Sequence, residues 1–405
     1  MVTKQDKFCK QNESESKDLA EILYYNPPPD GIQIELEDVS EKDKGWKKHK
    51  NENIEVKGLY LNPQIKYLKH SSIFFHYDMF NKYAFRMQEC ARVLLFGFEE
   101  GFKLKEGLFC HVRNCPICQW RKSLKWKAKM IEVYKHLKGD YPTHRWLMLT
   151  LTTKNCHISE LREELKKNND AWKKLTKRKE FASVVGWFRA TEVTRDKKRP
   201  ATYAHPHFHV MLLVKPSYFA KNYVKQMEWV RAWAECLEAD YMPNVDIRVV
   251  KAKANKSNTG QEEVHEIMGA VAESSKYALK PADMTGASYK KTLSKSQSCE
   301  QYKYEGEKEV MESMSIEDRL KYWFLEYTVQ VHRLRFIATG GVVKSALKDL
   351  DLTEDDSKDE KEDLLLTKVT DEAQSEVESE YNKDKRRIAF KWDLSKYLYN
   401  PAFNT

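Results

Sequence analysis

The chain has 405 residues, of which 41% are hydrophobic, and it contains 10 Trp and 21 Tyr, enough for two or three domains with an apolar core. The sequence lacks an apolar run of about 18 residues and begins with a polar segment that does not resemble a signal peptide. We therefore expect a soluble protein of the cytoplasm and exclude a membrane-spanning or secreted one.

The charge of the chain is unevenly distributed around a net value of +9. Residues 351–380 combine 13 Asp and Glu with three Lys, which gives −10, so the remainder of the chain carries +19. A basic excess favours a polyanionic partner, because each phosphate that Lys or Arg neutralises releases condensed counterions. Taken alone, the charge indicates the class of partner and nothing finer.

The first 140 residues contain two segments of different character. Residues 1–55 are polar and charged and include a run of three prolines, so we expect a loosely ordered lead-in and assign it no fold. Residues 56–140 contain apolar helical patches, a group of cysteines and a basic helix from Gln119 to Leu137. We predict that this second segment binds zinc and DNA.

Residues 141–285 alternate strands and helices in the order β-α-β-β-α-β-α. This order matches the split βαβ, ferredoxin-like plan of an α+β fold, in which helices back an antiparallel sheet and leave one face open. The predicted strands are Arg145–Thr153, Val184–Thr194, His205–Val214 and Val245–Val250; the predicted helices are Ser159–Leu175, capped by Ser159, Phe219–Glu238, and Val264–Lys280, ended by Pro281.

The C-terminal third extends this central domain over residues 286–345 and ends in an acidic linker and tail over residues 346–405. The predicted parts are a loop or insertion over 282–315, a helix over Ile316–Val331, a strand and turn over Arg335–Val343, and a segment over Arg386–Tyr399 that returns to the folded part.

Three histidines alternate along one predicted strand. His205, His207 and His209 share a face, because side chains at every second position of a strand point the same way, and imidazoles so placed can hold a divalent metal. Glu192 on the preceding strand is the expected third ligand, and a His and carboxylate set suits Mn²⁺ or Mg²⁺ acting on a phosphate. The alternative is a surface strand with chance histidines and an exposed carboxylate.

A line of three functional groups is predicted on the helix before Pro281. Glu273, Tyr277 and Lys280 are three or four residues apart and share a helix face. Tyr277 can attack a phosphodiester, Lys280 can hold the phosphate or lower the pKa of the phenol, and Glu273 can act as a general base. Without the histidine strand, the segment would be read as an ordinary amphipathic helix.

Four of the eight cysteines lie close together in sequence. Cys90, Cys110, Cys115 and Cys118 supply the four thiolates of a closed structural zinc site, and a cytosolic chain of this size rarely uses cysteines in disulfides. His111 could replace Cys110 as a ligand. The alternative is a set of small buried thiols.

Aromatic and basic residues interleave directly after the last of these cysteines. Trp120, Arg121, Lys122, Lys125 and Trp126 form a surface that could bind phosphates and stack on bases, so we predict that it helps to recognise DNA. The alternative is a solvated basic helix.

Together these residues resemble the HUH endonuclease superfamily, and in particular its plasmid rolling-circle replication initiators. The resemblance rests on the Thr-rich strand Leu149–Thr152, on His207-Phe208-His209, and on the Tyr-x-x-Lys pattern from Tyr277 to Lys280. Glu273 lies where one branch of the superfamily has glutamate in place of a second catalytic tyrosine. The resemblance covers residues 85–345.

The resemblance implies a metal-dependent nuclease acting on plasmid DNA. Tyr277 would nick the double-strand origin, keep the 5′-phosphate, and leave a 3′-OH primer, and Glu273 would activate water at termination. His207, His209 and Glu192 would hold the metal, whereas His205 is left open as a ligand, a support or a fold feature. Expected partners are origin DNA, single-stranded DNA, and host helicase and polymerase, with a homodimer among the possible states.

Two alternative functions are compatible with parts of the sequence. A mobilisation relaxase or single-tyrosine transposase uses the same chemistry without needing Glu273. A zinc-containing DNA-binding regulator without chemistry explains the charge and the cysteines, but gives the histidine strand and Tyr277 no role.

Overall fold

The computed structural model describes residues 45–61, 73–97, 103–250, 269–271, 279–294, 300–303, 305–352, 387–393 and 398–401. The chain divides into two compact units, which are treated separately below. Unit 1 comprises residues 1–57, 84–118 and 370–405; unit 2 comprises residues 58–83 and 119–369.

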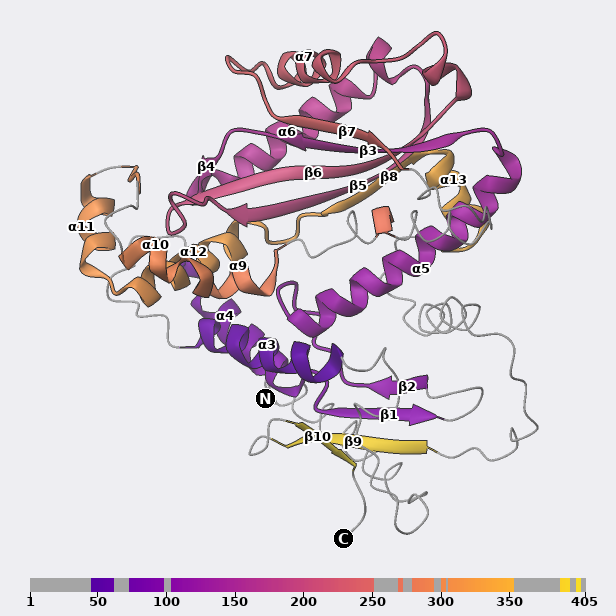
Figure 1. Cartoon of the computed structure of the whole chain (residues 1–405). Coiled ribbons are helices and arrows are strands. Elements are labelled where there is room, and N and C mark those ends of the chain that lie inside the picture. The colour runs from indigo at the N-terminus through magenta and orange to yellow at the C-terminus, as the bar shows by residue number, and fades with distance from the viewer. Residues whose placement is uncertain are drawn as a thin grey trace, which may run out of the picture. The chain divides into compact units, whose positions relative to one another are not determined.

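Unit 2 contains a six-stranded antiparallel sheet (Figure 1). The strands lie in the order β7-β3-β6-β5-β8, with β4 paired to β6. The chain order β3, β5, β6, β7 thus produces the strand neighbours of the ferredoxin-like plan, which confirms the predicted antiparallel α+β sheet. The strands are β3 (Arg145–Thr152), β4 (Cys156–His157), β5 (Val184–Arg195), β6 (Tyr203–Val214), β7 (Val245–Val249) and β8 (Ile337–Gly341).

Helices cover both faces of this sheet, as Figure 1 shows. Phe208, Val210 and Leu212 of β6 pack toward α6 (Leu161–Leu175) and α7 (Gln226–Leu237). Met211 and Leu213, on the opposite face, pack with α5 (Pro116–Asp140) and α13 (Val342–Asp349). α5 and α13 cover the Met211 and Leu213 end of this second face, and the histidines at the other end of β6 are partly exposed.

The segment predicted as a loop over residues 282–315 contains helices, so that prediction is wrong. Its polar composition hides them, because each helix is short and buries few residues, such as Met284 and Met311. The remaining elements of unit 2 are α9 (Pro281–Thr285), α10 (Lys290–Ser294), α11 (Glu305–Ser313), α12 (Ile316–Gln330), and the short 3₁₀ helices η2 (Phe74–His76), η3 (Ile158–Glu160), η4 (Lys179–Phe181), η5 (Pro216–Phe219) and η6 (Ala287–Tyr289).

Unit 1 contains a four-stranded antiparallel sheet in the order β10-β9-β1-β2. β1 pairs along its whole length with β9, which follows the acidic segment, so the return of the C-terminal segment to the folded part is confirmed. The elements are β1 (Val93–Gly97), β2 (Lys103–Gly107), β9 (Arg387–Asp393), β10 (Leu398–Pro401), most of α3 (Gly45–Tyr60) and the end of α4 (Tyr77–Glu89).

The predicted polar lead-in over residues 1–55 ends in a helix, because α3 begins at Gly45. Its buried positions include Trp46, His49, Lys50 and Asn53, which follow the three- and four-residue spacing of a helix face. Three of these four residues are polar, so hydropathy alone does not reveal the face.

Two helix ends differ from those predicted. The helix after the first strand starts at Leu161, and Ser159 lies in η3 instead of capping it. Residues 269–271 are helical, but Lys280 has extended backbone angles and is the N-cap of α9. The cause is Pro281, which disfavours helical angles in the residue before it. The helix predicted to end at Lys280 therefore does not include Lys280, and a separate helix, α9, begins at Pro281.

No helix in the part of the chain that the structure describes combines the length and apolarity needed to cross a membrane.

Candidate metal centres and nuclease site

The carboxylate of Glu192 lies between two histidines of the neighbouring strand. Its Oε2 is 3.1 Å from Nε2 of His207 and 2.9 Å from Nε2 of His209. Strand pairing produces this arrangement, because Glu192 is directly opposite His207 in the register of β5 and β6. One oxygen and two nitrogens thus lie within 4.8 Å of one another, as the sequence predicted for the metal ligands.

Hydrogen bonds orient both imidazoles toward this point. Nδ1 of His207 lies 3.3 Å from the carbonyl oxygen of His205, to which it can only donate. Nδ1 of His209 lies 3.5 Å from Oγ1 of Thr150 on β3. If a metal ion replaces the proton on Nε2, a ring that donates through Nδ1 presents its Nε2 lone pair to the ion, so the His205 carbonyl and Thr150 of the Thr-rich strand would orient the two ligands.

Lys280 reaches the same carboxylate from outside the sheet. Its Nζ lies 2.9 Å from Oε1 of Glu192, although Glu192 is buried and the lysine side chain is 47% exposed. Burial by itself would raise the pKa of Glu192, but hydrogen bonds from His207, His209 and Lys280 outweigh it and hold that pKa well below its usual range. Glu192 is therefore ionised and able to act as a metal ligand at neutral pH.

The residues present fit a catalytic divalent cation. Three protein ligands of mixed nitrogen and oxygen type, from Glu192, His207 and His209, leave further coordination positions for water or a phosphate oxygen. Their ligand atoms converge on one point, and His207 and His209 are each about one-tenth exposed, so a substrate can approach.

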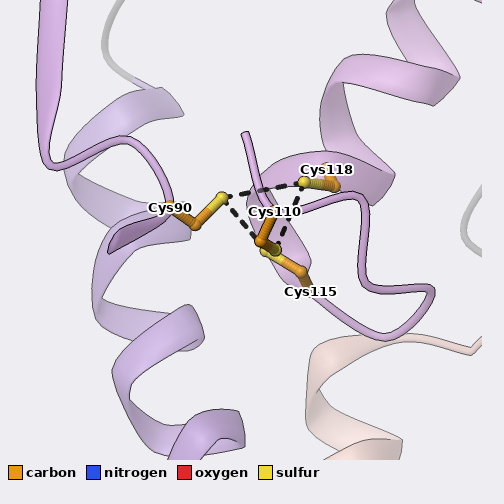
Figure 2. Close-up of side chains that lie close together, drawn as sticks. All are labelled: Cys90, Cys110, Cys115 and Cys118. Atoms are coloured by element: carbon orange, nitrogen blue, oxygen red, sulfur yellow. Dashed lines mark hydrogen bonds between the residues drawn. The ribbon is translucent and has the colours of Figure 1, made fainter. Parts of the chain in front are cut away.

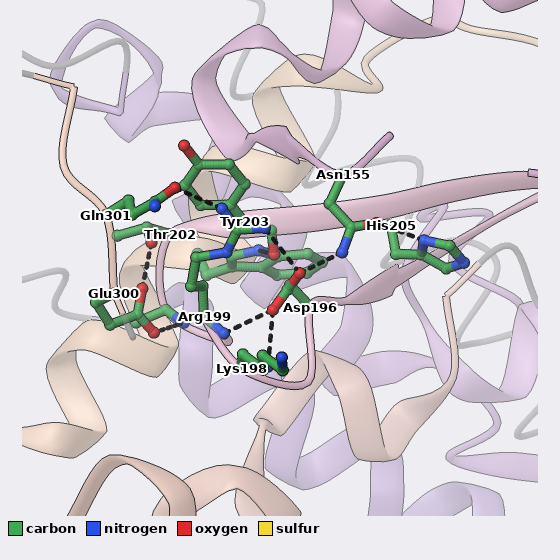
Figure 3. Close-up of polar contacts among 11 residues, drawn as sticks. Asn155, Asp196, Lys198, Arg199, Thr202, Tyr203, His205, Glu300 and Gln301 are labelled. Atoms are coloured by element: carbon green, nitrogen blue, oxygen red, sulfur yellow. Dashed lines mark hydrogen bonds and ion pairs between the residues drawn. The ribbon is translucent and has the colours of Figure 1, made fainter. Parts of the chain in front are cut away.

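His205 lies outside this group of ligands. Its Nδ1 is 2.6 Å from Oδ1 of Asn155, and the Asn155 amide donates to Asp196, as Figure 3 shows. The rings of His205 and His207 are adjacent, with centroids 5.1 Å apart. His205 therefore borders the site and links it to the turn between β5 and β6.

That turn is held by a polar network drawn in Figure 3. Oδ1 of Asp196 accepts the backbone N–H groups of Lys198 and Arg199, each at 2.7 Å. Arg199 also donates to Gln301, and Glu300 accepts the backbone N–H of Ala201. Sequence analysis did not identify Asn155 and Asp196; an acidic residue opening an otherwise basic loop was the available signal.

Tyr277 and Glu273 lie outside the described residues. Of the three residues predicted to share a helix face, the structure places Lys280 alone, and it brings Lys280 to Glu192. The roles of Tyr277 and Glu273 remain predictions from the sequence.

In unit 1 the four predicted cysteines come together (Figure 2). Sγ of Cys90 and Sγ of Cys110 each lie 3.6 Å from Sγ of Cys118, and Sγ of Cys115 lies 3.6 Å from Sγ of Cys90. Four sulfurs about 2.3 Å from a tetrahedral zinc ion would be about 3.8 Å apart, so the group fits zinc. His111 is exposed and does not belong to this group.

Helix α3 supplies polar partners to the cysteines. The amide of Asn53 donates to Sγ of Cys115 at 3.2 Å, and the buried ammonium of Lys50 donates to the carbonyl of Cys90. Burial lowers the pKa of Lys50, and the neighbouring cysteines Cys90 and Cys115 partly offset this. A buried cation beside four sulfurs would compensate the negative charge of a tetrathiolate zinc site.

The basic helix after the cysteines presents only part of its predicted surface. Trp126 is buried against Phe188, with ring centroids 5.5 Å apart, so its ring is not available to stack on a base, and this part of the prediction is wrong. Arg121 is also buried, whereas Lys122 is exposed and Trp120 and Lys125 are half-buried. A 25-residue helix must bury one face, and Trp126 belongs to that face.

Comparison with known proteins identifies the family of the chain. A family model described as Replication protein matches residues 101–400. The chain is 39% identical over 217 residues to Protein rep of Bacillus amyloliquefaciens, covering 52% of this chain and 63% of that protein. It is 31% identical over 323 residues to Protein rep of Lactiplantibacillus plantarum, covering 78% and 88%.

A third relative, Protein rep of Streptococcus pneumoniae, is 36% identical over 202 residues, which cover 48% of this chain and 59% of the relative. The chain thus spans less than two thirds of the length of some of these relatives. No solved structure matches it. Because the family model matches most of the chain, the protein belongs to the replication protein family.

Proposed function

We propose that the protein initiates rolling-circle replication of a plasmid by nicking one strand of the double-strand origin through Tyr277. The observation that carries this proposal is the carboxylate of Glu192, held between Nε2 of His207 and Nε2 of His209 and approached by Lys280. Membership of the replication protein family supports the same conclusion.

A metal ion bound by Glu192, His207 and His209, Mn²⁺ or Mg²⁺, would polarise a phosphate oxygen and stabilise the charge that develops on it. The protein orients the ligands through the His205 carbonyl and Thr150. Because the histidines of β6 are partly exposed, an extended DNA strand can place its phosphate there.

The reaction is a transesterification. The Tyr277 phenol loses its proton and its oxygen forms a bond to the scissile phosphorus, while the bond from phosphorus to the 3′-oxygen breaks. That oxygen takes up a proton and leaves as a 3′-OH, which primes a host polymerase. No co-reactant is consumed, because one phosphodiester replaces another.

Lys280 is placed to assist this step. Its ammonium lies at the metal ligands and is half-exposed, so it can contact a phosphate oxygen bound there. Tyr277 is three residues earlier in the sequence, and under this proposal it attacks the phosphate that Lys280 contacts.

Glu273 would act at termination. After one round of replication, a glutamate four residues before the nucleophile can take a proton from water and so direct hydrolysis instead of a second protein attachment. This role separates the proposal from a relaxase or transposase. In Glu273→Ala, nicking should persist while release of the strand is lost; intact release would remove the termination role.

The test of the nuclease function is covalent capture. Single-stranded origin oligonucleotide with Mn²⁺ or Mg²⁺ should yield a protein–DNA adduct that Tyr277→Phe abolishes. Tyr223→Phe, which alters a tyrosine 60% exposed on another part of unit 2, is the control and should retain the adduct. An adduct that persists in Tyr277→Phe would refute the assigned nucleophile, and none with wild type would favour a regulator without chemistry.

Origin recognition is proposed to involve the cysteine group of unit 1 and the start of α5. Lys122 and Lys125 remain accessible to phosphates, with Trp120 beside them. Replacing both lysines should weaken duplex binding and reduce its salt dependence by about one unit of slope for each lost phosphate contact. Host helicase and polymerase are the expected partners in the cytoplasm.

A further inference from the structure

Arg195, at the end of β5, is a buried arginine that makes hydrogen bonds to main-chain carbonyls of three separate segments. It is 1% exposed. Nε donates to the carbonyl of Asp283 at 2.6 Å, and Nη2 donates to that of Met284 at 3.1 Å. Further bonds reach the carbonyls of Pro200 and Leu320 at 2.8 and 2.7 Å.

The arginine is costly to bury, and its surroundings retain its charge. Burial lowers the pKa of Arg195 to about 9, with Asp283 offsetting part of this effect, so the guanidinium remains charged at neutral pH. Its Cζ lies 4.3 Å from the ring centroid of Trp323 on α12. A charged group that makes four main-chain bonds and a ring contact fixes the segments around it with defined geometry.

Two contacts join the start of α9 to β5. Lys280 contacts Glu192, and Asp283, three residues later, contacts Arg195, three residues after Glu192. Glu192 and Arg195 point to opposite faces of the strand, because side chains alternate along it. Two contacts on opposite faces of the strand fix the 280–284 segment in position and orientation relative to β5.

Resting on the proposed nuclease function, we propose that Arg195 is a positioning residue that clamps the start of α9 to β5 and thereby holds the Lys280 ammonium at the metal ligands. A positioning role differs from simple stabilisation, because it acts on the reaction through Lys280.

Arg189 provides a matched control on the same strand. It is also buried, at 5% exposure, donates to Asn169 at 2.6 Å, and lies 4.2 Å from the ring of Phe208. It packs on the α6 side of the sheet, where Asn169 and the ring of Trp172 on α6 contact it. Arg189→Lys and Arg195→Lys therefore both disturb a buried arginine, and only the second disturbs the clamp.

A second variant tests the clamp from the helix side. Gly286 has φ +66°, and a Cβ added there would lie 3.1 Å from Cζ of Arg195 and 2.8 Å from Cδ2 of Leu320. Gly286→Ala therefore displaces Arg195 or the end of α9 while every charge is kept. It covers the case in which Arg195→Lys fails to fold.

The first measurement requires no nuclease activity. The rate of Lys280 acetylation by an amine-reactive ester is followed by mass spectrometry in the full chain, with exposed Lys198 as internal reference. We expect the rate to rise several-fold in Arg195→Lys and Gly286→Ala and to stay unchanged in Arg189→Lys. Equal rates in wild type and all three variants would overturn the clamp.

The second measurement uses adduct formation on origin oligonucleotide with Mn²⁺. Arg195→Lys should lower kcat by about ten- to a hundredfold with KM within about twofold, whereas Arg189→Lys should lower the melting temperature without this loss. In a Lys280→Ala background, Arg195→Lys should have no further effect on kcat. If the two substitutions instead lower kcat by the product of their separate effects, Arg195 does not act through Lys280. If wild type forms no adduct but the acetylation rates differ as expected, the nuclease proposal fails and the clamp stands.

Discussion

Nζ of Lys280 lies 2.9 Å from Oε1 of Glu192, the carboxylate whose other oxygen meets His207 and His209. The Lys280 ammonium and a metal ion would both be attracted to the negative charge of Glu192, so the lysine should weaken metal binding. Lys280→Met should raise Mn²⁺ affinity by about two- to fivefold, as expected for a half-exposed ion pair, while it lowers the rate of nicking. Isothermal titration calorimetry and adduct formation measure the two effects.

Lys290→Met is the control, because Lys290 forms an ion pair with Glu317 away from the site, and it should change neither Mn²⁺ affinity nor the rate of nicking. Weaker Mn²⁺ binding in Lys280→Met would show that the lysine supports the metal site instead.

The three histidines of β6 should separate into two classes in metal binding. His207→Ala and His209→Ala each remove a ligand atom and should weaken Mn²⁺ binding by more than about a hundredfold. His205→Ala should preserve it, because His205 orients His207 through its main-chain carbonyl, which alanine retains. Calorimetric titration with Mn²⁺ distinguishes the classes, and loss of binding in His205→Ala would make His205 a ligand.

Zinc binding in unit 1 should depend on the buried ammonium of Lys50. Burial, the largest cause, and the neighbouring thiols raise the pKa of Cys90, so zinc must displace protons, and its affinity should rise with pH. Lys50→Met should weaken zinc binding by about tenfold, measured by competition with a chromophoric chelator, because the negative tetrathiolate loses a compensating charge. Lys48→Met is the control, since Lys48 lies on the same helix with a side chain 71% exposed. Equal losses in the two variants would exclude a specific role for Lys50.

The stability of unit 2 in acid should depend on a buried pair between β4 and α11. Nε2 of His157 lies 3.1 Å from Oε1 of Glu307, and both side chains are less than 10% exposed. Burial opposes ionisation of Glu307, but hydrogen bonds from His157 and the Lys303 backbone outweigh it and lower the pKa of Glu307. A depressed folded-state pKa contributes stability above the unfolded value of about 4.3, and this contribution is lost as pH falls through the folded value.

Glu307→Gln should therefore lower the urea midpoint at pH 6 to 7, and the difference from wild type should shrink progressively below about pH 4.3. Urea unfolding followed across pH 3 to 7 provides the measurement. Glu305→Gln alters a carboxylate that is 76% exposed on the same helix. The difference between its urea midpoint and that of wild type should not change with pH. A constant difference for Glu307→Gln at every pH would contradict the ion-pair explanation.

The central sheet and the grouping of Glu192, His207 and His209 were predictable because they follow from local periodicity. Alternation along His205–Val214 placed the histidines on one face, and the hairpin brought Glu192 opposite His207, as the register confirms. The four cysteines were likewise predictable, because zinc ligand spacing is short in sequence. The helices of residues 282–315 were missed, since short helices with few buried residues leave weak periodicity.

By itself, the sequence determined which chemical groups are present and which of them share a strand face, because side-chain alternation is a property of the local backbone. Only the tertiary structure decided that Lys280 contacts Glu192, that Arg195 ties α9 to β5, and that Lys50 and Asn53 reach the cysteines. These contacts join residues 40 to 88 positions apart. They depend on packing between elements, which no local pattern encodes.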